Sequence, residues 1–350
     1  MIIPNKPQLT AAEVSELQGL AGEFGVEVRP IQGASQSIFA LIGDETNDLL
    51  VKRIEGLEFI EKVDRVQVPY KLLSHNNPLS KEKHLINGKE LGKDFITMAG
   101  QCTIDYKNPN YFYETAQACK EAGADMLRGG VWKPRTSPYS FQGSAKSLDI
   151  LLEARERTGL KVVTEVMELE QVKLCVEAKV DCFQIGARNA LNYKLLEQVG
   201  QLTAETDMRV LLKRSIHMGK IDEFILAAEY IAGNGNPNVM MCPRGTQPGM
   251  DGYRNYPDEC ITPLLKEKTW APVIVDPSHS VGKAKYVPHA AMAAAAYGAD
   301  GVIIETHCHP IKGMGDDPKQ AITPEVLEKL IINMQLIAKN AREIRAAAHH

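Results

Sequence analysis

The segment Lys161-Val-Val-Thr-Glu-Val166, followed by the amphipathic stretch Leu169–Ala178 and then by Cys182-Phe-Gln-Ile185, decides the fold. Two short apolar runs that enclose a helical stretch are typical of a parallel β/α unit, because strands of a parallel sheet are buried on both faces. The same alternation starts near residue 95 and continues along the chain. It ends in a helix that is predicted to open at Thr323-Pro-Glu325, with a capping hydroxyl followed by proline.

Strand candidates of this kind recur through the chain, at Phe95–Ala99, Asp125–Arg128, Lys161–Val166, Cys182–Ile185, Arg209–Lys213, Asn238–Cys242, Val273–Asp276 and Gly301–Glu305. Further amphipathic stretches lie between them, at Tyr111–Glu121, Ser147–Thr158, Ile221–Ala232 and His289–Tyr297. Eight β/α units over about 250 residues match a closed (β/α)8 barrel better than an open sheet. We therefore predict an α/β protein with a TIM barrel over residues 94–346.

Residues 1–75 have a different pattern. Helices are predicted at Ala11–Phe24 and Asp48–Ile54, and strands at Ile2–Ile3, Val26–Pro30, Ser37–Ile42 and Ile60–Val68. This order resembles a small split-βαβ sandwich of ferredoxin type. We expect a ferredoxin-like α+β domain at 1–75 and a polar linker at 76–93, with a short strand at Leu85–Ile86. Because no catalytic constellation is visible in 1–75, this unit is expected to serve regulation or oligomerisation.

Composition excludes several classes of function. The chain has 350 residues, 44% of them hydrophobic, and a formal net charge of -4, which argues against general binding to nucleic acids or membrane surfaces. Its apolar runs are too short to cross a bilayer. Seven cysteines are scattered without CxxC spacing, which favours a reducing cytoplasm over a disulfide framework or a zinc ribbon.

The run Arg128-Gly-Gly-Val-Trp-Lys133-Pro-Arg135-Thr136 places three cations and a hydroxyl within nine residues, directly after a predicted strand. Guanidinium groups match the geometry of phosphate and carboxylate, so a solvated basic loop is the less favoured interpretation. In a TIM barrel the active site lies at the carboxyl ends of the strands. Reading those ends together gives seven cations at one barrel mouth: Arg128, Lys133, Arg135, Arg188, Lys213, Arg214 and Arg244. Such a set predicts substrates with phosphate and carboxylate groups.

A second set of strand-end residues has the chemistry of metal ligands. It comprises Cys102, His279, Glu305 and one acidic residue of the Gly315-Asp316-Asp317 loop, and it fits Mn, Fe, Co or Zn rather than Mg. Taken alone, Cys102 is better explained as a small buried hydrophobe, and His279 as a structural histidine. Together they predict a site in which the ion polarises an aldehyde while the cations hold a phosphorylated enol. His307 and His309 are weaker ligand candidates, and Cys242 and Cys308 are expected to pack nearby.

Five motifs carry a family resemblance: RGGxxKPRTSPYSFQG from Arg128, QIGARN from Gln184, LLKR from Leu211, DPSH from Asp276 and IETH from Ile304. Together they resemble 3-deoxy-D-arabino-heptulosonate 7-phosphate (DAHP) synthases, in particular the type Iβ enzymes with an N-terminal ferredoxin-like, ACT-type regulatory domain. The resemblance covers nearly the whole chain. It implies condensation of phosphoenolpyruvate with erythrose 4-phosphate, with release of phosphate, at the entry to the shikimate pathway.

The resemblance also implies roles for individual residues. Metal ligands would be Cys102, His279, Glu305 and Asp316, of which Asp316 keeps the family's spacing from Glu305. Phosphoenolpyruvate would be bound by Arg128, Lys133, Glu165, Ala187, Arg188, Lys213 and Arg244. Arg135 and Thr136 would hold the phosphate of the aldehyde, and Lys133 would deliver a proton. A cytoplasmic homotetramer with an aromatic amino acid as effector is a further expectation of the resemblance.

Several positions depart from the family pattern: Gly-Gln101-Cys-Thr103, Lys213-Arg214-Ser215, Pro243 before Arg244, and the loop Thr246–Tyr253. These changes surround the predicted site and remove none of its predicted ligands. Two alternatives therefore stay open beside a DAHP synthase. One is a related synthase that uses another phosphorylated aldose, and the other is a catalytically silent regulatory homologue.

Overall fold

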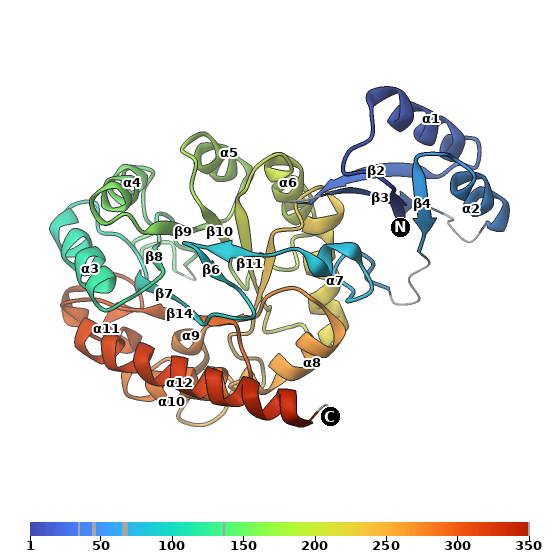
Figure 1. Ribbon diagram of the computed structural model, residues 1–350. Coiled ribbons are helices and arrows are strands. Elements are labelled where there is room, and N and C mark those ends of the chain that lie inside the picture. Colours follow the sequence, from blue (N-terminus) through green and yellow to red (C-terminus); the bar gives the residue numbers. More distant parts are fainter. Residues whose placement is uncertain (34–35, 44–46, 65–68, 136, 349–350) are drawn as a thin grey trace.

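The computed structural model describes residues 1–33, 36–43, 47–64, 69–135 and 137–348. Eight parallel strands form one sheet in the order β12-β11-β10-β9-β8-β7-β14-β13. They are β7 (Ile96–Gln101), β8 (Met126–Gly129), β9 (Lys161–Val166), β10 (Cys182–Ile185), β11 (Arg209–Lys213), β12 (Val239–Cys242), β13 (Ile274–Val275) and β14 (Gly301–Glu305). A parallel bridge between Met241 and Val273 joins the two edge strands and closes the barrel. The predicted fold class is confirmed (Figure 1).

Helices surround this barrel, and α12 runs along its outside (Figure 1). Their bounds are α3 (Pro109–Glu121), α4 (Lys146–Thr158), α5 (Leu169–Glu177), α6 (Tyr193–Thr203), α7 (Ile221–Gly233), α8 (Thr262–Lys268), α9 (Pro277–Val281), α10 (Val287–Ala296), α11 (Asp317–Gln320) and α12 (Pro324–Ala348). Short 3₁₀ turns add η1 (Pro78–Lys81), η2 (Glu259–Ile261), η3 (Ala284–Tyr286) and η4 (Pro310–Lys312). None of the helices in the described part of the chain is both long and apolar enough to cross a membrane.

The barrel interior is filled by side chains that alternate along each strand. Its apolar layers contain Ile96, Met98, Met126, Val163, Cys182, Leu211, Met240, Cys242, Ile274 and Ile303, and the linker residues Ile86 and Leu91 join the same cluster. Ile86 belongs to the two-stranded hairpin of β5 (Leu85–Ile86) and β6 (Lys89–Glu90). Because side chains two residues apart point to the same face of a strand, this register determines what lies above the apolar layers. The next inward positions toward the carboxyl ends are Gly100, Arg128, Glu165, Gln184, Lys213, Asp276 and Glu305.

Residues 1–63 form the predicted ferredoxin-like unit. It contains β1 (Ile2–Pro4), α1 (Ala11–Gly22), β2 (Glu27–Gln32), β3 (Ser37–Ile42), α2 (Asp48–Glu55) and β4 (Ile60–Val63). The strands pair antiparallel in the order β2-β3-β1-β4. The last strand was predicted to continue to Val68, but residues 65–68 lie outside the described residues.

Both faces of this small sheet are covered. Phe39 and Leu41 of β3 pack with the helices α1 and α2, whereas the intervening Ile38 and Ala40 belong to the hydrophobic cluster of the barrel. Arg29 of β2 donates hydrogen bonds to the Gly233 carbonyl at 3.1 Å and to Asn234 Oδ1 at 3.0 Å, at the end of α7. The ferredoxin-like unit is therefore docked on the barrel beside α7 (Figure 1).

Glu229 of α7 fastens the segment that connects the two units. Its carboxylate accepts hydrogen bonds from the backbone N–H groups of Lys71, Leu72 and Leu73 at 2.7, 2.6 and 3.1 Å. Trp270 adds a hydrogen bond from its indole N–H to the Leu72 carbonyl at 2.7 Å. The connection is consequently held against the barrel wall by buried polar contacts.

Candidate active site and metal centre

The inward layer above the apolar interior is polar, and it forms the floor of the candidate site. Arg128, Lys213 and Glu305 each stand at the carboxyl end of a strand and are almost fully buried. Buried charges require partners in the same layer, and the ion pairs Arg128–Glu305 and Lys213–Asp276 supply them. The period-2 register thus places opposite charges at one level of the barrel.

A thiol, an imidazole and a carboxylate meet on this floor. One potential ligand atom from each of Cys102, His279 and Glu305 lies within 4.8 Å of the other two, and all three residues are buried. Cys102 directly follows β7, and Gly100 shapes the backbone there with a φ of +147°. A Cβ at Gly100 would lie 2.0 Å from the Arg128 carbonyl oxygen. Only glycine therefore fits at this position of the backbone that leads to Cys102.

The imidazole of His279 is oriented from behind. Asp276 caps α9 by accepting the His279 N–H at 2.9 Å, and its other oxygen lies 2.8 Å from His279 Nδ1. Lys213 contacts the same oxygen of Asp276. Burial lowers the pKa of His279 to about 3, so the ring is neutral. With Nδ1–H donating to Asp276, the lone pair of Nε2 faces the cluster, which is the arrangement of a histidine ligand supported by a carboxylate.

Glu305 is ionised and held at both oxygens. Arg128 Nη1 donates to Oε1 at 2.9 Å, and Gln320 Nε2 donates to Oε2 at 2.7 Å. Burial alone would raise the pKa of Glu305, but the basic neighbours His279, Arg128 and Lys133 lower it below its usual range. His279 Nε2 lies 3.2 Å from Oε1, so both groups offer electron pairs to the same point.

The thiol of Cys102 is the third donor. Burial raises its pKa to about 11 and Glu305 adds to the rise, whereas Lys133 and Arg128 oppose it. A thiolate at this place needs positive charge close by, and a divalent cation bound here would supply that charge and displace the proton. The donor set of sulfur, nitrogen and oxygen fits a transition ion.

The two neighbouring aspartates that were both candidates for the fourth ligand separate in the structure. Asp316 Oδ2 lies 4.0 Å from His279 Nε2. Asp317 is fully buried, and its Oδ1 accepts the backbone N–H of Cys102 at 2.9 Å. Its Oδ2 has no hydrogen-bond partner among the described residues, and burial next to Glu305 raises its pKa well above the usual range. Asp316 is thus the side chain that faces the cluster, and Asp317 supports the Cys102 backbone.

A cavity of about 650 Å³ opens above the cluster. Seven of the nine residues predicted to bind substrate line it: Lys133, Arg135, Glu165, Ala187, Arg188, Lys213 and Arg244, together with His279 and Asp316. Arg128 is not among the lining residues and bonds Glu305 instead. Thr136 lies outside the described residues. Arg214, one of the seven predicted cations, is buried against Asp258 at 3.0 Å and is a structural residue.

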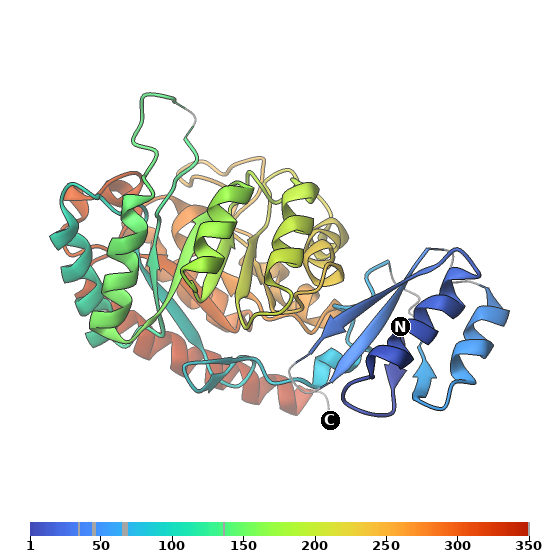
Figure 2. The same cartoon turned by 90° about the horizontal axis from the view of Figure 1, so that it is seen from above.

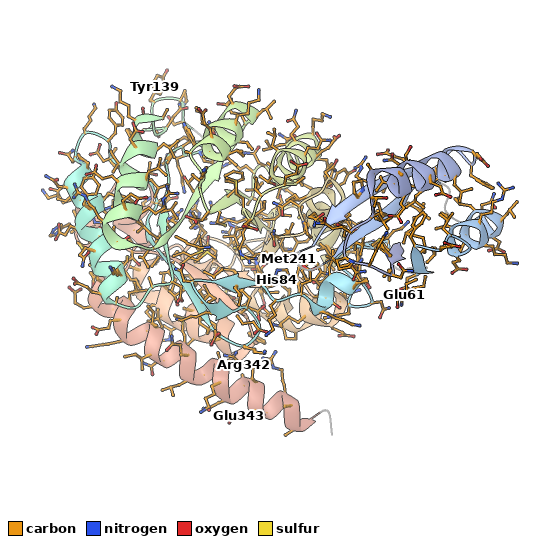
Figure 3. The ribbon with its side chains drawn as sticks, turned by 45° about the horizontal axis from the view of Figure 1, so that its top comes forward. Glu61, His84, Tyr139, Met241, Arg342 and Glu343 are labelled. Carbon is orange, nitrogen blue, oxygen red and sulfur yellow. The ribbon has the colours of Figure 1, made fainter. Side chains whose placement is uncertain are left out.

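The predicted anion-binding loop projects from the barrel mouth. The segment between β8 and α4 rises clear of the strands (Figure 2), and Tyr139 near its tip is 96% exposed (Figure 3). Arg135 points back to the base, where its Nε donates to the Phe141 carbonyl at 3.0 Å and its Nη2 to Thr103 Oγ1 at 3.3 Å. The guanidinium is thereby fixed beside the cavity.

The weaker ligand candidates lie elsewhere. His307 accepts the His309 N–H through its Nδ1 at 2.8 Å, and the His309 ring contacts Glu114 at 3.1 Å. Cys242 is part of the apolar barrel interior, and the Cys308 N–H donates to Thr115. No sequence signal pointed to Gln320 or Arg254, because Gln320 ends the four-residue helix α11 and Arg254 lies on a loop, and neither segment has a periodic pattern. For Asp276 a signal existed, since a carboxylate three residues before His279 is a helix cap.

A pH-dependent contribution to stability is expected from Glu259, which lies under α9. Its Oε1 accepts the Ser280 hydroxyl at 3.0 Å, and burial raises its pKa from 4.5 to about 7. The folded state therefore keeps a proton that the unfolded chain releases, and the free energy of unfolding falls as pH rises from about 4.5 to 7. We expect Glu259→Gln to remove this fall, worth about 3 kcal/mol. Melting temperatures of both proteins between pH 5 and 8 test this, and parallel curves would contradict it.

Comparisons with known proteins agree with the geometry. The sequence model of the DAHP synthetase I family matches residues 76–342, and that of the DAHP synthase ferredoxin-like domain matches residues 1–68. A phospho-2-dehydro-3-deoxyheptonate aldolase of Thermotoga maritima is 36% identical over 340 residues, which cover 97% of this chain and 98% of that protein. A 2-dehydro-3-deoxyphosphooctonate aldolase of Caulobacter vibrioides is 32% identical over 69% of this chain and 87% of its own length.

Solved structures give the same result. The crystal structure of the phospho-2-dehydro-3-deoxyheptonate aldolase (DAHP synthase) from Thermotoga maritima matches with a TM-score of 0.72 and 34% identity, covering 97% of this chain and 96% of that one. A truncated form of 3-deoxy-D-arabino-heptulosonate 7-phosphate synthase from the same organism matches 77% of this chain and 96% of its own, with a TM-score of 0.68. The chain therefore belongs to the DAHP synthetase I family and carries the ferredoxin-like domain of DAHP synthases.

Proposed function

We propose that this protein is a 3-deoxy-7-phosphoheptulonate synthase, a transferase that condenses phosphoenolpyruvate and erythrose 4-phosphate to DAHP and phosphate. The cluster of Cys102, His279 and Glu305 beside a cation-lined cavity carries the proposal. The sequence relatives favour this aldehyde, because identity to the deoxyheptonate aldolase extends over 97% of the chain, whereas identity to the deoxyphosphooctonate aldolase covers 69%. The matched ferredoxin-like domain favours the same choice.

Cys102, His279, Glu305 and Asp316 would hold one divalent ion, with Mn, Fe, Co and Zn as candidates. Bound there, such an ion would supply Lewis-acid polarisation of the aldehyde oxygen. The surrounding residues prepare the donors: Asp276 fixes the tautomer of His279, and Arg128 and Gln320 hold Glu305. Because these ligand groups are buried and already held in place, little free energy is lost in rearranging them when an ion binds.

The cations would bind the anionic groups of both substrates. Lys133, Arg188, Lys213 and Arg244, with Arg128 below them, surround the space proposed for phosphoenolpyruvate, and Glu165 and Ala187 complete its wall. Arg135 and Thr136 would bind the phosphate of the aldehyde. Holding both molecules in one cavity turns a bimolecular step into an effectively unimolecular one, which lowers the barrier by several kcal/mol.

Lys133 is the proposed proton donor. It is 5% exposed, and although burial opposes its charge, neighbouring Cys102, Glu165 and Glu305 raise its pKa above the usual value. When C3 of phosphoenolpyruvate attacks the aldehyde carbon, the aldehyde oxygen takes up negative charge and accepts this proton. Water then adds at C2 and gives up one proton, which restores the ammonium group of Lys133. The resulting hemiketal phosphate loses phosphate by C–O cleavage, and its hydroxyl proton passes to the departing phosphate as the C2 ketone forms.

The domain plan proposed for this activity is a regulatory unit at 1–75, a linker at 76–93 and a catalytic barrel at 94–346. We place the protein in the cytoplasm, in agreement with seven free cysteines. We expect it to form a homo-oligomer and assign it no nucleic-acid or membrane partner. By resemblance the oligomer is a tetramer with an aromatic amino acid as effector. The first step of the shikimate pathway suits such feedback control.

A substrate comparison tests the proposed function. Chelated protein, restored with each candidate ion, is supplied with phosphoenolpyruvate and either erythrose 4-phosphate, arabinose 5-phosphate or ribose 5-phosphate, and phosphate release is followed. We expect turnover with erythrose 4-phosphate and little with the pentose phosphates. Preference for a pentose phosphate would show a related synthase with another aldose, and no phosphate release with any aldose would identify a silent homologue.

A further inference from the structure

Arg254 makes two contacts at the edge of the candidate metal centre. Its Nη1 donates to Asp316 Oδ2 at 3.2 Å and to Gln320 Oε1 at 3.2 Å. Within the described residues, no other group donates a hydrogen bond to the Asp316 carboxylate. Gln320 in turn donates to Glu305 at 2.7 Å. One guanidinium therefore contacts the fourth candidate ligand directly and the third through a single amide.

The backbone of Arg254 is fixed to the segment that carries His279. Its N–H donates to the Val281 carbonyl at 3.1 Å, and the side chain of Asn255 donates to the His279 carbonyl at 2.8 Å. Gly282 has a φ of +69°, and a Cβ there would lie 2.5 Å from Arg254 Cβ. The backbone of Arg254 thus lies beside the segment that carries His279, and its side chain contacts Asp316.

Asp316 needs such a tie more than the other candidate ligands do. Glu305 ends the strand β14, whose pairing with β7 fixes its backbone, and His279 lies in a helix capped by Asp276. Asp316 instead precedes the short helix α11 in the connection between β14 and α12 and, in the part of the chain that the structure describes, its side chain makes no capping hydrogen bond that would fix its direction. The ion pair with Arg254 is partly exposed, with side-chain exposures of 34% and 24%, so its contribution to folding stability is small. We expect the ion pair instead to fix the orientation of the Asp316 carboxylate.

Building on the metal site proposed above, we infer that Arg254 is a positioning residue, which holds the Asp316 carboxylate toward His279 and thereby strengthens binding of the divalent ion. A direct role at the substrate is the competing explanation, because Arg254 also lines the cavity. The two explanations differ in what they predict for the protein without substrate. A positioning role changes ion affinity, whereas a substrate contact changes KM alone.

The test is a double-mutant cycle on the full-length protein stripped with a chelator. Affinity for Co²⁺ is measured by calorimetry for wild type, Arg254→Ala, Asp316→Asn and the double variant, and absorption spectra report the cobalt–thiolate band. We expect Arg254→Ala to weaken binding by about tenfold, the scale of lost outer contacts at metal sites. In the Asp316→Asn background the same change should cost less than twofold, because the group it positions is already altered. Lys283→Ala, an exposed cation nearby, should bind like wild type.

Three outcomes would overturn the inference. An equal loss of affinity in both backgrounds would show that Arg254 acts independently of Asp316. Unchanged affinity with a raised KM for erythrose 4-phosphate would assign it to the substrate. No binding of Co²⁺ by wild type would remove the metal site itself, and with it this role. Arg254→Lys, which keeps the charge but lacks the planar fork, should fall between wild type and alanine, and circular dichroism excludes misfolding as the cause.

Discussion

Cys102→Ser is expected to abolish nearly all activity, with kcat lowered about 1000-fold, equivalent to about 4 kcal/mol of lost transition-state stabilisation. The reason is the donor itself. Serine has almost the same size, but its hydroxyl does not deprotonate as a thiol does, so it is a much weaker ligand than a thiolate for a divalent transition ion. Metal content and phosphate release, measured on the same samples, check the prediction.

The matched control is Cys260→Ser, because Cys260 is exposed and is not one of the three residues of the cluster. It should keep the metal content and the rate of wild type within twofold. Cys102→Ser that retained stoichiometric metal and full activity would contradict the proposed ligand set. Loss of metal without loss of activity would separate the ion from the chemistry.

Lys133→Met should lower kcat by about 1000-fold while leaving ion affinity close to wild type, since a proton donor typically contributes between 100- and 10,000-fold. Methionine keeps the length and the apolar packing of the side chain and removes only the ammonium group. Lys133→Arg keeps the charge but cannot release its proton, so it should bind phosphoenolpyruvate and still turn over slowly. Steady-state kinetics and metal titrations on these variants make the comparison.

An exposed lysine provides the control for this pair. Lys146 lies at the start of α4 near Tyr106, and Lys146→Met should behave like wild type. If Lys133→Met raised KM and left kcat unchanged, Lys133 would be an anion-binding residue only. If Lys133→Arg were fully active, electrostatic stabilisation rather than proton transfer would explain its role.

Strands were the most predictable part of this protein. Gly301–Glu305 and Arg209–Lys213 occur as predicted, because strands covered on both faces consist of continuous apolar runs. The carboxyl ends of these strands lie at one end of the barrel. Cys102, His279 and Glu305 could therefore be assigned to one site from the sequence alone. This step needed the barrel to close, which β12 and β13 accomplish through a single bridge.

Residues on long loops could not be predicted in the same way. Asp316 and Asp317 are adjacent, and only the path of the chain after β14 decides which one faces the imidazole and which one turns to the Cys102 N–H. Arg214 directly follows Lys213, yet it points to Asp258 because strand alternation turns neighbouring side chains to opposite sides. That alternation was available from the sequence and would have removed Arg214 from the cationic set.

The docked ferredoxin-like sheet has a consequence for any signal that passes between the two units. Ile38 and Ala40 contribute to the same apolar cluster as the barrel, and Glu229 anchors the connecting backbone. The unit is therefore not free to move independently of the barrel. Moving it away would expose the apolar side chains between the two units to water. An effector that acted through this unit would accordingly have to shift these apolar contacts slightly, because releasing the unit from the barrel would expose them to water.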